Sequence, residues 1–388
     1  MKTLAFLNKV ICVLIVSIVL IFSIQTEAVS SNQECKWVPV DPNSFAGILT
    51  MVGERVRENH NKLSTWQGKI KIVTDSIDRG AIAERTFREE LKNDEQPIPN
   101  IIIEHYEFTR EFALDVNKEM LYEHHYPDRP KHHIMDADTG RELQLKKYIS
   151  LGSVKNILTS DYQIHCGADR VRVSDGVAFS RMAVKQARPE GKLTCKSGMH
   201  PVFDPRETMR VFGNPLWKAF ASYLAYIDKH GPSSTFQGYT MKVEVEECNV
   251  GDVKKYKIVL PSVSSGGPKV YLSSTLICSS EAGFNVVSYS QTADYDKILE
   301  HKTWNYGLIN GVYIPVKQTK KSFDYLTGNL NKQSTLTFIE QKVNKSIPEE
   351  VFTYKNLGLK NGDKFIDKIL GKEYIYQDGE LIPADKKK

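Results

Sequence analysis

The chain has 388 residues, of which 41% are hydrophobic, so it is long enough to bury a large core. Its formal net charge is only +5, and no run of lysine and arginine with interleaved aromatic residues occurs, so we expect no nucleic-acid binding. No Gly-x-Ser-x-Gly elbow, Gly-rich phosphate loop or Cys-x-x-Cys motif is present. The sequence therefore predicts a protein that is not an enzyme, with no catalytic residues and no cofactor.

Residues 1–28 are typical of a targeting segment. Lys2 and Lys9 form a basic start, Val10 to Ile24 run apolar without a charge, and Thr26 to Ala28 provide small residues at a cleavage site. This pattern predicts export to the periplasm or out of the cell. The apolar run is close to the length of about 20 residues that spans a membrane, so a retained anchor stays open as an alternative. Removal of the segment lowers the net charge to +4.

Disulfide bonds are expected in an exported protein. Cys12 leaves with the targeting segment, and the remaining cysteines are Cys35, Cys166, Cys195, Cys248 and Cys278. We expect the pairs Cys166–Cys195 and Cys248–Cys278, which leave Cys35 unpaired.

Residues 29–43 are predicted to be a linker, and an amphipathic helix follows. The helix is indicated by apolar residues that recur at intervals of three and four, namely Phe45, Ile48, Leu49, Val52 and Val56. Ser44 is available as its N-cap, and the pattern ends near His60. A turn over Leu63–Gly68 then leads into a strand that contains Ile70 and Ile72.

The next part of the chain is predicted to be mostly β-structure. The expected short strands are Ile101–Phe108, Glu111–Val116, Glu119–Tyr126, Leu143–Ile149, Tyr162–Cys166, Val171–Val173 and Ala178–Val184.

Two helices interrupt the strands. Asp204 and Pro205 open the first as N-cap and first helical residue, and Asn214-Pro215 opens the second, which ends at His230-Gly231. One face of the second helix carries Leu216, Phe220, Tyr223, Leu224 and Ile227. Either this face is ordinary core, or the helix closes the mouth of an incompletely closed barrel and leaves an apolar cavity for a lipid. On the second interpretation these five residues bind the ligand.

Residues 238–343 read as six or seven antiparallel strands. Met241, Val243 and Val245 alternate with charged residues, and turn residues separate the successive runs. The fold class expected is mainly β (α+β), with a large, curved, open antiparallel sheet, or unclosed barrel, and helices packed on its concave face. Residues 344–388 are expected to be a C-terminal extension with a short strand at Glu373–Tyr376.

A group of histidines and aspartates is the sharpest polar cluster. It consists of His124, His125, Asp128, His132, His133, Asp136 and Asp138. Such side chains can bind zinc or another transition metal. Neighbouring residues in a strand point to opposite faces, however, so each histidine pair can supply only one ligand to a site. We predict solvated hairpin tips and no metal, with Asp136–Gly140 as a turn.

The order of elements resembles the LolA/LolB-type lipoprotein-carrier superfamily. The resemblance covers most of residues 44–343, and its most familiar stretches are Asp115-Val116, Ser174-Asp175-Gly176, Gly283-Phe284-Asn285-Val286 and Trp304-Asn305-Tyr306-Gly307. It implies an open, strongly curved antiparallel sheet plugged by helices, in a protein that shields lipid moieties in the bacterial envelope.

The resulting expectation is a non-catalytic exported protein that binds a lipid or other hydrophobic ligand. Its expected partners are a lipid or an acylated protein, together with a membrane surface. Two alternatives stay open: an envelope structural or protein-interaction module with a filled core, and a metal-dependent hydrolase built on the histidine cluster.

Overall fold

The structure is a computed structural model of the chain. It describes residues 35–90, 98–126, 131–144, 154–159, 162–166, 171–175, 203–211, 214–236, 239–263, 270–294 and 297–384. The expected targeting segment, Cys195 and the strand expected over Ala178–Val184 lie outside these residues. Among the helices that are described, none combines the length and the apolar character needed to cross a membrane.

The predicted meander is present as seven strands, each antiparallel to the next. They are β12 (Glu244–Val250), β13 (Val253–Val263), β14 (Tyr271–Ser279), β15 (Val286–Ala293), β16 (Lys297–Ile309), β17 (Val312–Phe323) and β18 (Leu330–Val343). Val245 and Ile258 lie opposite each other and are buried, whereas Glu244 and Lys257 are partly exposed. The period of two in the sequence therefore marks one buried face and one wetter face.

Two long strands extend this sheet. β18 pairs with β2 (Thr65–Arg79), and β2 pairs along its whole length with β3 (Ile101–Asp115). The two strands predicted between Ile101 and Val116 are thus one continuous strand of 15 residues. The two halves of β3 pair with β4 (Met120–His125) and β5 (Lys131–Asp136).

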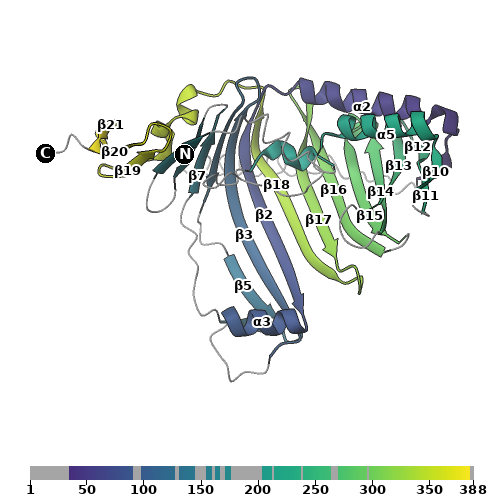
Figure 1. Cartoon of the computed structure of the whole chain (residues 1–388), viewed down its shortest axis with the longest axis horizontal. Helices are drawn as coiled ribbons and strands as arrows, with labels where there is room; N and C mark the ends of the chain where they lie inside the picture. Colours follow the sequence, from purple (N-terminus) through teal and green to yellow (C-terminus); the bar gives the residue numbers. More distant parts are fainter. Residues whose placement is uncertain are drawn as a thin grey trace, which may run out of the picture.

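The remaining strands pair, directly or through one another, with β12, β4 or β5. They are β1 (Val38–Pro39), β6 (Glu142–Leu143), β7 (Val154–Leu158), β8 (Tyr162–Cys166), β9 (Val171–Asp175), β19 (Lys364–Asp367), β20 (Lys372–Gln377) and β21 (Glu380–Pro383). β10 (Ser233–Phe236) and β11 (Tyr239–Lys242) form a separate hairpin. Within the described residues, β9–β19 is the one parallel pairing. The sheet curves without closing (Figure 1), which confirms the predicted mainly β, open-sheet fold class.

Two helices lie side by side across the strands of the meander (Figure 1). α2 (Phe45–Asn61) and α5 (Leu216–His230) pack on the same buried side chains of β12 to β16. Both were predicted, but Ser44 makes no side-chain cap; Asp41 instead caps the short helix η1 (Pro42–Ser44). Asn59 fixes α2 to β17, because its side chain donates to Tyr313 O at 2.8 Å and accepts from Tyr313 N at 2.7 Å.

Shorter helices complete the structure. η2 (Pro205–Met209) begins at the predicted cap Asp204, and Trp304 Nε1 donates to its Thr208 carbonyl at 2.7 Å. The others are η3 (Ser280–Ala282), η4 (Glu349–Phe352) and η5 (Tyr354–Leu357). α3 (Ala81–Glu90) was not predicted, and it packs Ala83 and Phe87 on the far ends of β3 and β5.

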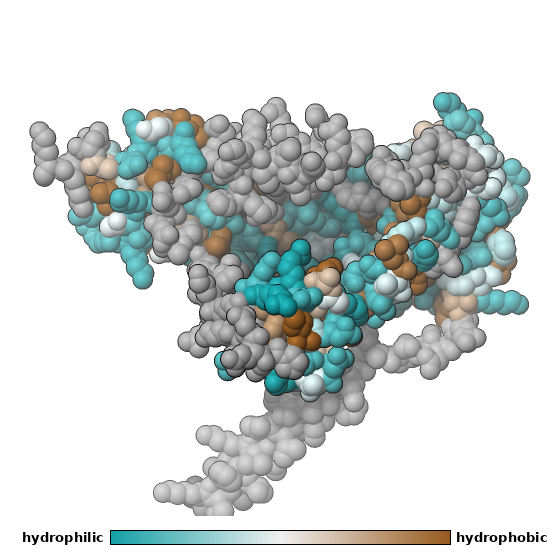
Figure 2. All heavy atoms as spheres, turned by 60° about the horizontal axis from the view of Figure 1, so that its bottom comes forward, coloured by the Kyte–Doolittle hydropathy of each residue, from teal (hydrophilic) through white to brown (hydrophobic). Residues whose placement is uncertain are grey.

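The sheet has two differently covered faces. One face, the helix face, carries α2, α5, η2 and α3. It is marked by residues that lie opposite one another across β2, β18, β17 and β16, namely Ile72, Leu336, Gln318 and Trp304. The residues next to these in each strand point to the other face, the C-terminal face. There η4 and η5 cover Ala113, Tyr122, Ile157 and Ile164. Among the described residues in the view of Figure 2, hydrophilic ones predominate and hydrophobic ones form small groups.

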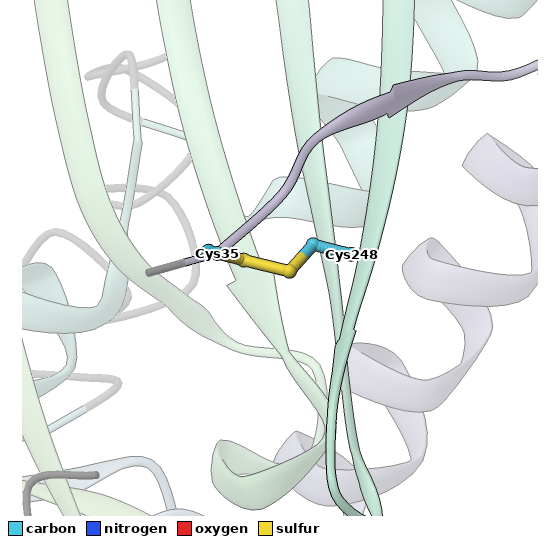
Figure 3. The surroundings of a disulfide bond; sticks show 2 residues. All are labelled: Cys35 and Cys248. Carbon is cyan, nitrogen blue, oxygen red and sulfur yellow. A yellow bond between two sulfur atoms is a disulfide. The ribbon is translucent and has the colours of Figure 1, made fainter. Parts of the chain in front are cut away.

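The disulfide expectation was wrong. Cys35 bonds to Cys248, which ties the N-terminal segment to β12 (Figure 3). Cys278 is a buried free thiol, and burial raises its pKa to about 12. Cys166 is also free. β1 pairs with β12, so Cys35 lies beside Cys248 although 213 residues separate them in the sequence.

Candidate ligand-binding site

α5 is positioned by its two ends and by its apolar face. Pro215 precedes its first residue, and Gly231 ends it with a φ of 77°, donating its N–H to Ile227 O at 2.7 Å. Glycine adopts this backbone conformation readily, so the chain can leave the helix at that point. The apolar face then packs toward α2 and the sheet.

The five predicted ligand-binding residues divide into two groups. Leu216 and Phe220 are each only 1% exposed and belong to the core between α5, α2 and the sheet. Tyr223, Leu224 and Ile227 are partly buried and pack against the edge of the same core. Leu216 and Phe220 therefore lie within this core, and the partly buried residues further along α5 lie at its margin.

An apolar cavity of about 180 Å³ lies beside that C-terminal half. It is lined by Ser222, Tyr223 and Tyr226 of α5, Met241 of β11 and Pro261 of β13. Of the five predicted residues, Tyr223 alone lines it. An apolar wall of this kind favours an uncharged, hydrophobic ligand.

The polar atoms at the cavity are already engaged. The Tyr223 hydroxyl donates to Pro261 O at 3.3 Å, and burial raises the pKa of Tyr223 to about 12. The Tyr226 hydroxyl bonds to the Ser234 hydroxyl. The rings of the two tyrosines can therefore line the cavity without leaving a buried polar group unpaired.

Four of the lining residues were not predicted from the sequence. Ser222 and Tyr226 lie at the margin of the apolar face of α5, where a helical pattern does not separate core from surface. Met241 was recognised as a buried strand residue, but nothing local places β11 and Pro261 of β13 beside this helix. A weak signal was the position of Tyr226 three residues after Tyr223, one helical turn along the same side.

The histidine and aspartate cluster is divided among different strands. His124 and His125 are neighbours in β4, which pairs with one half of β3, whereas His132 and His133 are in β5, which pairs with the other half. Burial lowers the pKa of both His124 and His125. Asp128 lies outside the described residues, and those residues contain no group of three or more His, Cys, Asp or Glu side chains that could hold a metal ion.

Asp136 is part of a turn, as predicted. Its carboxylate accepts hydrogen bonds from Asp138 N and Thr139 Oγ1, which lower its pKa. Gly140, with a φ of 68°, donates its N–H to Asp136 O at 2.8 Å and completes the turn.

A second hollow, of about 230 Å³, lies on the C-terminal face where β2, β3 and β18 meet η4 and η5. Its lining includes Lys69, Glu111, Glu340 and Lys342, and Lys69 pairs with Glu340 at 2.6 Å. Two positive and two negative side chains at one hollow give no net attraction for an ion, and their charge disfavours an acyl chain. The α5 cavity is therefore the better candidate for a hydrophobic ligand.

Comparison with known proteins yields structural neighbours only. No protein-family model matches the sequence, and no curated protein matches it. A DUF1329 family protein from Desulfovibrio piger shares 8% identity, with a TM-score of 0.35 over 82% of this chain and 100% of its own. A LolA superfamily protein from Nitrosomonas europaea shares 9%, with a TM-score of 0.31 over 79% of this chain and 97% of its own.

A third neighbour is a domain named as an outer membrane lipoprotein-sorting protein, from Vibrio parahaemolyticus. It shares 10% identity, with a TM-score of 0.30 over 79% of this chain and 97% of its own. The structural neighbours include a DUF1329 family protein and proteins of the LolA superfamily.

Proposed function

We propose that the protein is an exported, non-catalytic binding protein for a lipid or another hydrophobic ligand, held beside α5. The observation that carries this proposal is the apolar cavity between the C-terminal half of α5, β11 and β13. Cavities lined mainly by apolar and aromatic side chains are the usual form of a small-molecule site. The absence of a catalytic signature in the sequence and the engaged hydroxyls at the cavity support binding without chemistry.

The size of the cavity limits how the ligand binds. Its volume of about 180 Å³ is below the roughly 300–1,000 Å³ of typical ligand pockets. It has room for about six groups of the size of a water molecule, at about 30 Å³ each. At about 0.8 kcal/mol for each buried methylene, filling it with the end of an acyl chain contributes on the order of 5 kcal/mol before the costs of association. We therefore expect the rest of the ligand to lie along the outer side of α5 past Ser222.

Export and partners form part of the same proposal. The targeting pattern of residues 1–28 and the Cys35–Cys248 disulfide both fit an oxidising compartment such as the periplasm. We propose residues 44–343 as the ligand-binding domain and residues 344–388 as an extension to it. The partner is a lipid or an acylated protein taken up at a membrane surface.

The proposal is tested by filling the cavity from the helix side. Ser222 is exposed on α5 and lines the cavity, so Ser222→Trp should occupy the space of the ligand. We expect uptake of dansyl-labelled undecanoic acid, measured by fluorescence titration, to fall at least tenfold. Ala225→Trp is the matched control, because Ala225 is also exposed on α5 but does not line the cavity.

Circular dichroism and the melting temperature establish that both variants are folded. Equal uptake by Ser222→Trp and the wild type would show that the site is wrong. The competing interpretation, an interaction module with a filled core, is favoured by the burial of Leu216 and Phe220. A folded wild-type protein that takes up neither the fatty acid nor phospholipid would decide for that interpretation.

A further inference from the structure

Four polar side chains form a row across β2, β3, β5 and β6. Asp75 lies directly opposite His105, and His105 lies directly opposite His133. Glu142 lies opposite Met135, two residues along β5 from His133, and so projects from the same face. The residues that contact α3 are Ile102, Ile134 and Leu143. They are an odd number of positions from the row residues of the same strands, so the row lies on the face opposite to α3.

Each histidine in the row contacts its own carboxylate. His105 Nδ1 lies 2.6 Å from Asp75 Oδ1, and His133 Nδ1 lies 2.6 Å from Glu142 Oε1. The two rings are neighbours, with 6.4 Å between their centroids. Their side chains are 26% and 43% exposed, so a small ion in solvent can reach both.

These contacts fix where each imidazole carries its proton. An ionised carboxylate can only accept a hydrogen bond, so Nδ1 of each ring is the donor. In the neutral ring the lone pair is then on Nε2, the atom that is left to ligate a metal. A carboxylate bonded to the non-ligating nitrogen is the usual arrangement around a metal-binding histidine, because it orients the ring and raises its basicity.

From this row we propose a transition-metal site in which His105 and His133 bind one divalent ion through Nε2. Asp75 and Glu142 act behind them, orienting the rings and adding two negative charges near the ion. Two imidazole ligands suit Cu²⁺, Ni²⁺ and Zn²⁺, and Cu²⁺ should bind most tightly of the three.

The proposed metal site is separate from the proposed lipid site, and the protein does not fill all the coordination positions of the ion. It lies on the face opposite to α5, so loss of either activity leaves the other unaffected. The described residues contain no larger group of potential ligands, so the protein supplies two ligands and the other positions are open to water or to a donor atom of a partner. His105 was not part of the predicted cluster, and His133 was.

The test uses the full exported protein without an affinity tag and copper chloride alone. We expect calorimetric titration to show one Cu²⁺ per chain, with an electron paramagnetic resonance spectrum of two nitrogen ligands. His105→Ala and His133→Ala should each weaken binding at least tenfold. His301→Ala is the control, since His301 bonds to Ser290 on another part of the sheet, and it should bind as the wild type does.

Asp75→Asn keeps the side-chain size but removes the charge behind His105. Loss of such an outer contact typically weakens metal binding by about 10- to 100-fold, and a weakening in this range with both nitrogens retained would support the assigned role. Wild-type affinity in His105→Ala or His133→Ala, with the melting temperature unchanged, would overturn the site. Absence of copper binding by the wild-type protein would overturn it equally.

Discussion

The two faces of the sheet use the same strands for different purposes. On the helix face, Val245, Ile258 and Leu276 lie side by side in β12, β13 and β14, and each is 2% exposed or less. One residue along the same strands, the opposite face carries pairs such as Lys257 with Glu246, at 2.8 Å. Alternation along a strand thus places a hydrophobic core and its cavity on one face and polar pairs on the other.

This comparison predicts a large difference between adjacent residues of β13. Ile258→Ala should lower the free energy of unfolding by about 2–5 kcal/mol, because it removes fully buried methyl groups and leaves a cavity. Lys257→Ala should cost no more than about 1 kcal/mol, because Lys257 and Glu246 form a partly exposed ion pair. Urea denaturation measures both, and equal losses would show that the two faces are not distinguished as described.

Loss of the disulfide between the N-terminal segment and the sheet is expected to have the next largest effect on stability. Cys35→Ser removes the disulfide to Cys248 and should destabilise the protein by about 2–4 kcal/mol, because the unfolded chain loses a cross-link. Cys166→Ser is the control, since Cys166 is a free thiol. Thermal melting should also show that a reductant lowers the stability of the wild type and leaves Cys35→Ser unaffected.

A partly buried histidine of α2, His60, should make stability depend on pH. Burial, with a further contribution from Arg206 and Arg210, lowers the pKa of His60 from 6.5 to about 4. The unfolded state therefore binds more protons than the folded state between these values, so the stability present above pH 6.5 is lost as the pH falls toward 4.

This loss should amount to roughly 2 kcal/mol between pH 7 and pH 5. His60→Phe keeps an aromatic ring against Trp217, which lies 4.8 Å away between centroids, and removes the titrating group. Denaturation at the two pH values should show a smaller difference for this variant. An unchanged difference would assign the acid sensitivity to other groups.

The smallest expected effect concerns the polar contact at the cavity. Tyr223→Phe removes the 3.3 Å hydrogen bond to Pro261 O and should cost about 0.5–1.5 kcal/mol. Ligand uptake should be unchanged, because the ring and not the hydroxyl forms the wall. A large loss of uptake in the folded variant would instead indicate that the ligand is recognised through a polar group.

The strands and helices could be predicted where their signal is local. The alternation through residues 238–343 gave the meander, and apolar residues at intervals of three and four gave α2 and α5. α3 was missed because Ala83 and Phe87 are its only fully buried apolar residues. The break expected within β3 did not occur, since β2 pairs with it along its full length.

Contacts between distant segments could not be predicted from local patterns. Cys35 meets Cys248 only because β1 pairs with β12, and His105 meets His133 only through the register of β3 and β5. The candidate ligand-binding site could likewise be predicted only in part. The helical pattern found the apolar face of α5, but the cavity depends on Met241 and Pro261, which the fold brings to the margin of that face.

The most direct test of the α5 cavity is native mass spectrometry of the protein purified from its native source, followed by organic extraction. We predict a bound lipid on the wild type and on Ala225→Trp, and its loss from Ser222→Trp. A folded wild-type protein of purely apo mass, with no lipid in the extract, would contradict the proposed lipid binding. The interaction module would then be the better interpretation.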